Sequence, residues 1–243
     1  DQAVSRGLGD VYKRQFGYWA GWMGASMALW RLAARLSGNK GPETGVASFA
    51  SKTDVETAID ALLGGKGTGL SAVVIGAKGR SGQGACELLE KFGVSISRWD
   101  IEETRNLDQE ALLNHDILVN CVLMTGPGLC LVRPTDLDGA ASKLQIISDV
   151  SCDPFSDFNP LPIYDEPTSW TQPYLKIGRN RRGDDIELTA IDNLPSLLPR
   201  EASEDFSQQL LPTLLNYPDG RAWRNAHTCF EAIAKQLADL EGV

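Results

Sequence analysis

The fold of this chain is decided by residues 71 to 84, Ser71-Ala-Val-Val-Ile-Gly-Ala-Lys-Gly-Arg-Ser-Gly-Gln-Gly84. A short apolar run leads into Gly76, Gly79 and Gly82, and an acid, Asp100, follows 18 residues after the last of these glycines. This order is typical of the strand–turn–helix–strand unit that binds a dinucleotide. Gly76 lets the chain turn sharply out of the strand, and the free amides at the start of the next helix would face the pyrophosphate.

The spacing of these glycines is G-x-x-G-x-x-G, whereas the common motif is G-x-G-x-x-G, so the glycines alone could also form an ordinary strand–helix turn. The apolar run Val94-Ser-Ile-Ser97 and the acid after it favour the cofactor turn. Asp100 would accept hydrogen bonds from both hydroxyls of the adenosine ribose, and a 2′-phosphate would meet its carboxylate. The sequence therefore predicts NAD rather than NADP. Arg80 is either a solvated loop charge or a partner of the pyrophosphate.

The composition limits the classes of partner. The 243 residues, of which 42% are hydrophobic, suffice for one large α/β domain or somewhat more. A net charge of −9 argues against a nucleic acid or an anionic membrane as partner. The five cysteines are scattered and there are two histidines, so we expect no disulfide framework and no metal site. Reduced thiols and a cytoplasmic location are the expectation.

The segment Gly17–Leu36 is the one that resembles a membrane span. Its uncharged part ends at Arg31 and contains three glycines, which leaves about half of the roughly 20 apolar residues that a span needs. We therefore expect a buried connecting helix. Residues 1–15 before it are polar, show no clear period and indicate an irregular start of the chain.

Apolar periodicity and turn residues predict the other elements. Strands are expected over 71–75, 94–99, 117–122, 144–150 and 186–191, and helices over 51–63, from the glycines to about 92, over 108–114, from 201 and over 221–240. This alternation predicts an α/β fold with a doubly wound, mainly parallel, Rossmann-like sheet. A cofactor-binding domain is expected over 16–195 and a helical segment over 196–243. Ligands of such sheets bind beyond the carboxyl ends of the strands, where four segments would converge.

From Phe16 onward the chain resembles the NAD-dependent, lysine-forming saccharopine dehydrogenases. The residues that carry the resemblance are Phe16-Gly-Tyr-Trp-Ala-Gly21, Val74-Ile-Gly-Ala-Lys-Gly-Arg-Ser-Gly82, Trp99-Asp-Ile-Glu-Glu-Thr104, Val119-Asn-Cys-Val122, Asp149-Val-Ser-Cys-Asp153, Asn159-Pro-Leu-Pro-Ile-Tyr164 and Ile191-Asp-Asn-Leu-Pro-Ser-Leu-Leu-Pro-Arg-Glu-Ala-Ser-Glu204. The last run is the most specific, because so long a match rarely recurs by chance. These residues correspond to the C-terminal two-thirds of that family.

The resemblance implies oxidative cleavage of saccharopine to L-lysine and 2-oxoglutarate in the aminoadipate pathway of lysine biosynthesis, by a monomeric enzyme. A hydride leaves the carbon that bears the secondary amine for NAD, and the resulting imine is hydrolysed. The implied cofactor contacts are Gly79 and Arg80 at the phosphates, Asp100 at the ribose with Thr104 nearby, and Leu123, Val150, Ile191, Asp192, Asn193 and Leu194 along the groove. The implied substrate contacts are Ser151, Cys152 and Asp153, with Phe16 at the edge of the pocket.

Each of these assignments has a structural alternative. Ser151 and Asp153 could cap the turn that follows them. Asp192 could be a helix N-cap, and Val150 and Ile191 would by default belong to the core at strand ends.

Position 123 carries leucine in place of the aromatic residue of the family, which would weaken stacking on the cofactor.

The chain also departs from the family. The family's acid–base pair, a lysine and a histidine, lies in the region that precedes Phe16, and residues 1–15 do not resemble that region. His115 and His227 match neither position, and His115 is interpreted as a solvated loop residue. No catalytic residue is therefore expected here. We expect a truncated enzyme, inactive alone, whose C-terminal helices belong to a truncated second domain. Apolar side chains should then be partly uncovered at Trp22, Leu29, Leu210, Leu211 and Phe230.

Two other functions stay open at this point. The chain could be a non-catalytic NAD(H)-binding module, which an upstream coding sequence without the lysine and the histidine would favour. It could also be a related alanine dehydrogenase or the lysine–ketoglutarate reductase of bifunctional enzymes. The reductase prefers NADP and should lack a carboxylate equivalent to Asp100.

Overall fold

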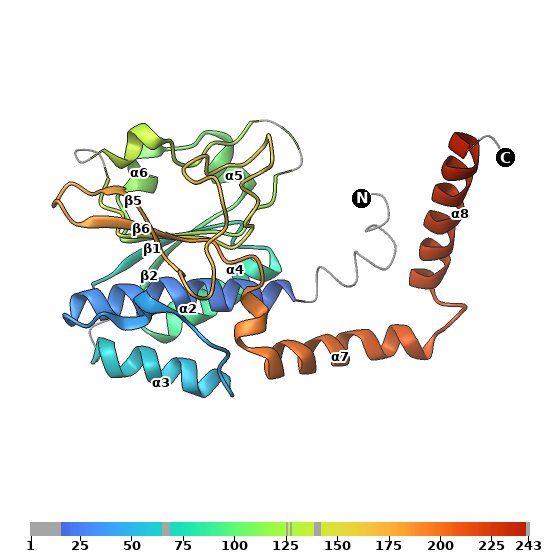
Figure 1. Ribbon diagram of the computed structural model, residues 1–243, viewed down its shortest axis with the longest axis horizontal. Coiled ribbons are helices and arrows are strands. Elements are labelled where there is room, and N and C mark those ends of the chain that lie inside the picture. The colour runs from blue at the N-terminus through green and yellow to red at the C-terminus, as the bar shows by residue number, and fades with distance from the viewer. Residues whose placement is uncertain (1–15, 65–68, 125, 127, 139–141, 242–243) are drawn as a thin grey trace. The chain divides into compact units, whose positions relative to one another are not determined.

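A computed structural model describes residues 16–64, 69–124, 126, 128–138 and 142–241 of the chain, with the side chains of 239–241 left out (Figure 1). The chain divides into two compact units, which are described separately. One unit comprises residues 18–199, and the other comprises residues 1–17 together with residues 200–243. The residues expected to form an irregular start, 1–15, lie outside the described part.

The unit of residues 18–199 is built on one six-stranded sheet with the strand order β2-β1-β3-β4-β6-β5 (Figure 1). Five strands are mutually parallel, and β5 runs antiparallel to β6 at one edge. The strands are β1 Ser71–Ile75, β2 Ser95–Trp99, β3 Ile117–Asn120, β4 Ile146–Asp149, β5 Leu175–Arg179 and β6 Asp185–Thr189. The chain leaves β1 toward β2 on one side and continues to β3 on the other. The carboxyl ends of β1 and β3 are therefore the topological switch point of the sheet, where ligands of such folds bind.

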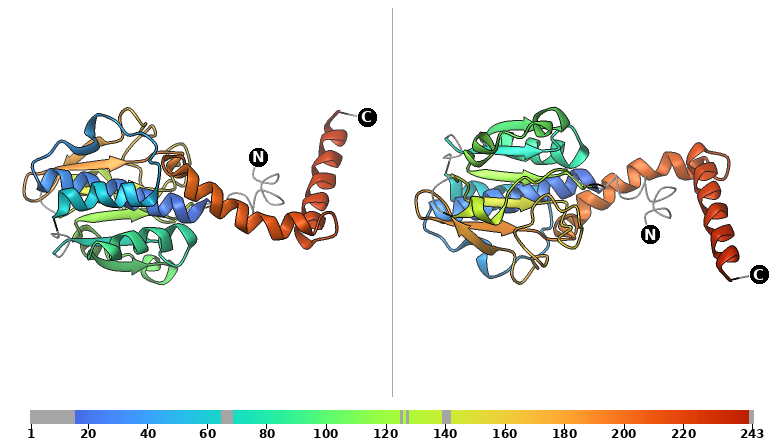
Figure 2. Two further views of the ribbon diagram at one scale, coloured as in Figure 1. Left: turned by 90° about the horizontal axis from the view of Figure 1, so that it is seen from below. Right: turned by 90° about the horizontal axis from the view of Figure 1, so that it is seen from above.

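Helices cover both faces of this sheet, which confirms the doubly wound α/β prediction (Figures 1 and 2). The helices α2 Gly17–Leu36, α3 Lys52–Leu63 and α4 Arg80–Lys91 lie on one face, and α5 Ile101–Arg105 and α6 Gln109–Leu113 lie on the other. Short 3-10 turns are η2 Gly41–Thr44, η3 Pro134–Leu137 and η4 Leu194–Leu197. Two separate apolar clusters fill the space between the sheet and its two helical layers.

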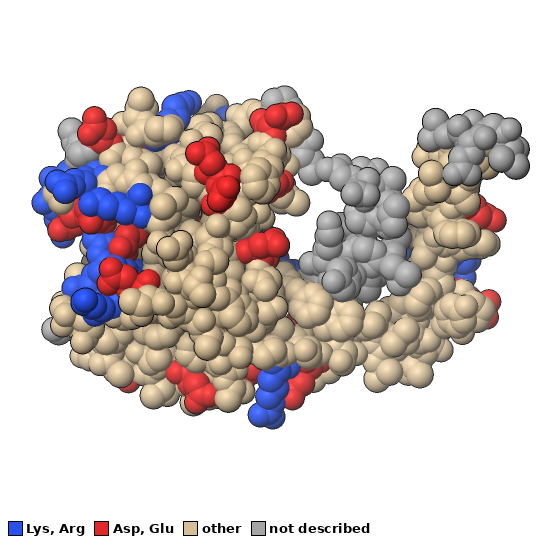
Figure 3. All heavy atoms as spheres, in the orientation of Figure 1, with Lys and Arg blue, Asp and Glu red and all other residues tan. Residues whose placement is uncertain are grey.

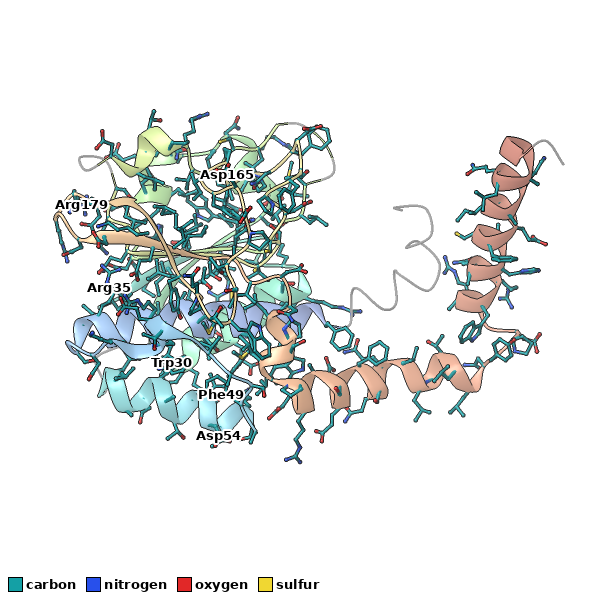
Figure 4. All side chains as sticks on the ribbon, in the orientation of Figure 1. Trp30, Arg35, Phe49, Asp54, Asp165 and Arg179 are labelled. Atoms are coloured by element: carbon teal, nitrogen blue, oxygen red, sulfur yellow. The ribbon has the colours of Figure 1, made fainter. Side chains whose placement is uncertain are left out.

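The helix α2 is the buried connecting helix that the sequence predicts. Trp22 and Leu29 are fully buried, so the prediction that they would be partly uncovered is wrong. They pack in the same apolar cluster as residues of α3 and α4, which supply the cover. On its flank, Trp30 meets Phe49 edge to face, with 5.5 Å between the ring centroids (Figure 4). Among the described helices, none combines the length and the apolar character needed to cross a membrane.

An ion pair ties α2 to the sheet. Arg31 is nearly fully buried and donates from Nε and Nη2 to the two carboxylate oxygens of Glu187 in β6, each at 2.7 Å. The hydrogen bond to Glu187 raises the pKa of Arg31 above its ordinary value, although burial acts in the other direction. Such a bidentate pair fixes geometry as well as charge, and so it sets the register of α2 against β6.

The second unit contains α7 Pro199–Leu215, of which residues from 200 belong to it, and α8 Arg221–Glu241. Phe16 and Phe206 stack within this unit, with ring centroids 4.9 Å apart and planes 6° from parallel. Several large apolar side chains of α7 and α8 are exposed, namely Leu211, Leu214, Leu215, Phe230 and Leu237. The exposure predicted for Leu211 and Phe230 is therefore confirmed.

Charged side chains of both signs lie on the face of the molecule that Figure 3 shows. Lys and Arg side chains gather at the end of the first unit that holds the β5–β6 hairpin. Carboxylates lie among them, since Asp185 pairs with Lys176 at 2.6 Å and lies 3.6 Å from Arg179. The basic side chains at this end thus form a mixed patch rather than a uniformly positive one.

Candidate functional site

The glycine turn between β1 and α4 lies at the carboxyl edge of the sheet. Gly76 has a φ of +75°, in the left-handed region that glycine adopts without strain. Its amide and that of Ala77 donate to the carbonyl oxygen of Trp99 at 2.8 and 3.1 Å, which ties the turn to the end of β2. A Cβ atom at Gly82 would come within 2.2 Å of the Gly76 carbonyl oxygen. The turn is therefore so tight that these two positions require glycine.

The first turn of α4 has the features of an anion site. Gly79 is its N-cap residue, in an extended conformation, and no side chain caps the helix there. The twelve-residue helix presents its first amides and the positive end of its dipole at the carboxyl edge of the sheet. Lys78 and Arg80 are exposed on either side of the N-cap. This stretch of backbone and its two cations fit a pyrophosphate.

Asp100 lies next to this turn, as the sequence predicts for an acid at the end of the second strand. One carboxylate oxygen accepts a hydrogen bond from the amide of Lys78 at 3.1 Å, and the other accepts one from the amide of Ile101 at 2.9 Å. The Oγ1 atom of Thr104 donates to the Asp100 carbonyl oxygen at 2.8 Å. A carboxylate offers about four acceptor positions, so about two remain for ribose hydroxyls. Asp100 and Thr104 therefore fit the sugar end of a dinucleotide.

The segments after β4 and β6 reach the same edge. The amide of Val150 donates to the carbonyl oxygen of Asn120 at 2.9 Å, which joins the ends of β4 and β3. Ile191 is almost fully buried, as the core alternative for it requires. Leu194 is also almost fully buried, whereas Asp192 and Asn193 between them are exposed.

The exposed residues near these strand ends make few contacts with the described part of the chain. Leu123, after β3, is 60% exposed, so its side chain could contact a ligand without any rearrangement of the core. The Oδ1 atom of Asn193 accepts a hydrogen bond from Nε1 of Trp170 at 3.1 Å. Asn193, rather than Asp192, is the N-cap residue of η4, and it makes no capping hydrogen bond. The N-cap alternative for Asp192 is thus wrong.

A buried polar network lies directly behind the predicted substrate loop, and sequence reasoning missed its central residues. Asp149 at the end of β4 is fully buried, and its Oδ2 atom accepts from the hydroxyl of Tyr164 at 2.6 Å. Burial, and then the carboxylate of Asp149, raise the pKa of Tyr164, so the phenol stays protonated. The Oδ1 atom of Asp149 accepts from Nδ2 of Asn120 at 2.9 Å and from Oγ of Ser151 at 2.6 Å. Asn120 and Asp149 stand within the quoted motifs, which was the available signal.

Cys152 sits in this loop with a φ of +48°, the one non-glycine residue in the left-handed region among those described. Its Sγ atom donates to the carbonyl oxygen of Ala190 at 3.2 Å. Burial, and then the carboxylates of Asp149, Asp192 and Asp153, raise the pKa of Cys152 to about 12. The group is therefore a thiol at neutral pH and is unsuited to act as a nucleophile.

The described residues do not place three or more His, Cys, Asp or Glu side chains together as metal ligands would lie. Phe16 belongs to the other unit, and its predicted place at the edge of the substrate pocket stays a prediction.

The interpretation of His115 as a solvated loop residue is wrong. It is half-buried, its Nε2 atom lies 2.8 Å from Oγ of Ser97, and its ring meets Trp99 edge to face. The helix α6 ends just before His115 and turns the imidazole toward β2, which the sequence did not indicate. These contacts join the loop before β3 to β2 and leave His115 with a structural role.

The comparison with family models finds no match. Curated relatives do match, and each bears the name saccharopine dehydrogenase [NAD(+), L-lysine-forming]. The chain is 37% identical to that of Neurospora crassa over 232 residues, 34% to that of Emericella nidulans over 230 residues and 32% to that of Candida albicans over 248 residues. These alignments cover 92%, 88% and 93% of this chain and 61%, 61% and 64% of the relatives, so the chain spans about three fifths of their length. The resemblance seen in the sequence is thereby confirmed, and the chain is a relative of the L-lysine-forming saccharopine dehydrogenases.

Proposed function

We propose that the chain binds NAD at the carboxyl edge of its sheet, as the cofactor-binding part of an enzyme that cleaves saccharopine oxidatively to L-lysine and 2-oxoglutarate. The observation that carries the proposal is the joining of the glycine turn and Asp100 into one hydrogen-bonded unit, through the amide of Lys78. The names of the curated relatives supply saccharopine as the substrate, NAD(+) as the cofactor and L-lysine as a product.

Different residues of the chain would bind different parts of NAD. The amides after Gly79 and the guanidinium of Arg80 hold the pyrophosphate, and Asp100 accepts the hydroxyls of the adenosine ribose. Thr104 holds the backbone of Asp100 in place. The residues that line the rest of the groove are Leu123, Val150, Ile191, Asp192, Asn193 and Leu194. When bound, NAD supplies the hydride acceptor.

The substrate would lie against the loop of Ser151, Cys152 and Asp153. Oxidation of the carbon that bears the secondary amine gives an imine, and addition of water releases lysine and 2-oxoglutarate. We assign no catalytic residue to this chain, because His115 is engaged by Ser97 and His227 lies on the exposed surface of α8 beside Glu231. A cytoplasmic location and a monomeric full-length enzyme are part of the same proposal.

Isothermal titration calorimetry with NADH and NADPH tests the proposal. We expect NADH to bind this chain in the micromolar to millimolar range and to bind more tightly than NADPH, because the carboxylate of Asp100 repels a 2′-phosphate. We expect no turnover of saccharopine by the chain alone. A preference for NADPH, or the absence of binding by both cofactors, would overturn the cofactor assignment.

A further inference from the structure

The hydrogen bonds around Ser151 show which atom donates and which accepts in each of them. The Oδ1 atom of Asp149 accepts from the backbone amides of Ser151 and Cys152, at 3.1 and 3.3 Å. The side-chain amide nitrogen of Asn120 lies 2.9 Å from the same oxygen. These three N–H groups can only donate, and three acceptances leave no place for a proton on this oxygen. The Ser151 hydroxyl, whose Oγ atom lies 2.6 Å from the same oxygen, therefore donates its single proton to Asp149.

Asn120 fixes the second contact of the hydroxyl. Its Oδ1 atom accepts from the amide of Val122 at 3.2 Å, which sets the orientation of the side-chain amide. Its Nδ2 atom then lies 3.0 Å from Oγ of Ser151 and donates to it. A serine oxygen has one proton and two lone pairs, so the contacts with the described residues leave Ser151 one free lone pair and no free proton.

This free lone pair belongs to a residue that is half-buried and lies at the carboxyl end of β4, within the proposed site. We infer that Ser151 acts as an acceptor-only contact in the ligand site, and that the ligand group it meets is an N–H donor. The inference rests on the proposed function. A carbonyl or carboxylate oxygen at this place would face the lone pair without a proton between them, so it is disfavoured.

Two ligand groups carry such a donor. One is the carboxamide of the nicotinamide, and the other is the amino nitrogen of the substrate, which becomes the side-chain amine of lysine. Asp149 is in both cases a positioning residue, because it holds the proton of Ser151 and the backbone of the loop.

The experiment measures affinity ratios by calorimetry on the intact chain. The first arm compares NADH with the reduced form of 3-acetylpyridine adenine dinucleotide, in which a methyl group replaces the carboxamide nitrogen. The second arm compares lysine with norleucine, which lacks the side-chain amine, in the presence of saturating NADH. We expect wild type to favour the N–H ligand in one arm by about threefold to tenfold, and Ser151→Ala to reduce that ratio to about one.

The arm in which the ratio changes identifies the source of the donor. Ratios that are equal in wild type and in Ser151→Ala in both arms overturn the inference. Ser156→Ala, in the same loop region but outside the Asp149 network, should leave both ratios unchanged. If Ser151→Ala fails to fold, Ser151→Cys replaces it as the test variant, because the cysteine sulfur is only a weak acceptor.

Titration with ADP-ribose separates this inference from the proposed function. ADP-ribose carries the adenosine and the pyrophosphate but no nicotinamide. Failure of ADP-ribose and NADH to bind refutes the proposed function, and the inference with it. Binding of both, with ratios that do not respond to Ser151→Ala, refutes the inference alone.

Discussion

Asp100 both caps α5 and binds the amide of Lys78, and it is the acid proposed to bind the ribose. We predict that Asp100→Ala weakens NADH binding by about 1–3 kcal/mol, because a charge-assisted hydrogen bond to the sugar is lost. The variant should also lose about 1 kcal/mol of stability through the missing cap. Calorimetry measures the first effect, and urea denaturation measures the second.

Asp108 offers a matched control for this substitution. It is the N-cap of α6 and accepts from the amide of Ala111 at 2.9 Å, but it contributes to no proposed ligand contact. Asp108→Ala should therefore lower stability by a similar amount and leave the affinity for NADH unchanged. Equal affinities in the Asp100→Ala variant and wild type would mean that the acid serves the cap alone.

Asp116 lies almost fully buried at the opposite, amino edge of the sheet and makes stability depend on pH. Burial alone would raise the pKa of its carboxyl, but hydrogen bonds from Lys143 at 2.7 Å and from Ser71 outweigh it and hold the pKa below the ordinary 3.8. A carboxyl group with a lowered pKa stabilises the fold fully above its ordinary pKa. That contribution is lost as the pH falls through the lower pKa of the folded state.

We predict that Asp116→Asn removes this pH dependence and costs about 1–3 kcal/mol at neutral pH, since Lys143 loses its counter-charge. The free energy of unfolding, measured by urea denaturation between neutral pH and pH about 3, should fall more steeply for wild type than for the variant. Parallel curves would show that the ion pair contributes nothing to acid sensitivity.

At the scale of elements, helices α2 and α4 approach each other through glycines. A Cβ atom at Gly84 of α4 would lie 2.1 Å from the carbonyl oxygen of Tyr18, and one at Gly21 of α2 would lie 1.7 Å from that of Ser81. These are backbone atoms and cannot rotate away. The crossing thus places α2 directly behind the first turn of α4, where the pyrophosphate would bind.

We predict that Gly84→Ala destabilises the chain by about 1–2 kcal/mol, because overpacking against the backbone outweighs the gain of about 1 kcal/mol in helix propensity. It should also weaken NADH binding, since the start of α4 must shift. Thermal denaturation and calorimetry measure the two effects. Gly126→Ala, whose added methyl group would meet no atom within 4 Å, should change neither, and a stabilised Gly84→Ala variant would contradict the close crossing.

The elements differ in how well the sequence predicts them. The strand β1 has the predicted bounds, since a short continuous apolar run between glycines is typical of a buried parallel strand. The strand β5 was not predicted, because Leu175–Arg179 is half-exposed and shows no apolar run. Its position is set by pairing with β6 at the sheet edge, which is a tertiary contact without a local signal.

At the scale of the whole molecule, the sequence likewise predicts one part of the candidate site and not the other. The glycine turn and Asp100 follow one local motif, so the sequence indicates them directly. The network of Asn120, Asp149 and Tyr164 joins residues up to 44 positions apart, and only the parallel order of β3 and β4 brings them together. Hydrogen-bond direction at Ser151 depends on that network and was therefore beyond sequence analysis.

The exposed apolar side chains of α7 and α8 lead to a prediction about the behaviour of the chain in solution. Leu211, Leu214 and Leu215 lie three and four residues apart, so they form one apolar face of α7. A contiguous apolar face promotes association, and we predict that the average mass of this chain in sedimentation velocity rises with concentration. The double variant Leu211→Gln, Leu215→Gln should reduce that rise. Ile101→Gln, which removes a single exposed apolar residue from α5, should not. An equal reduction in both variants would show that the face on α7 is not the site of association.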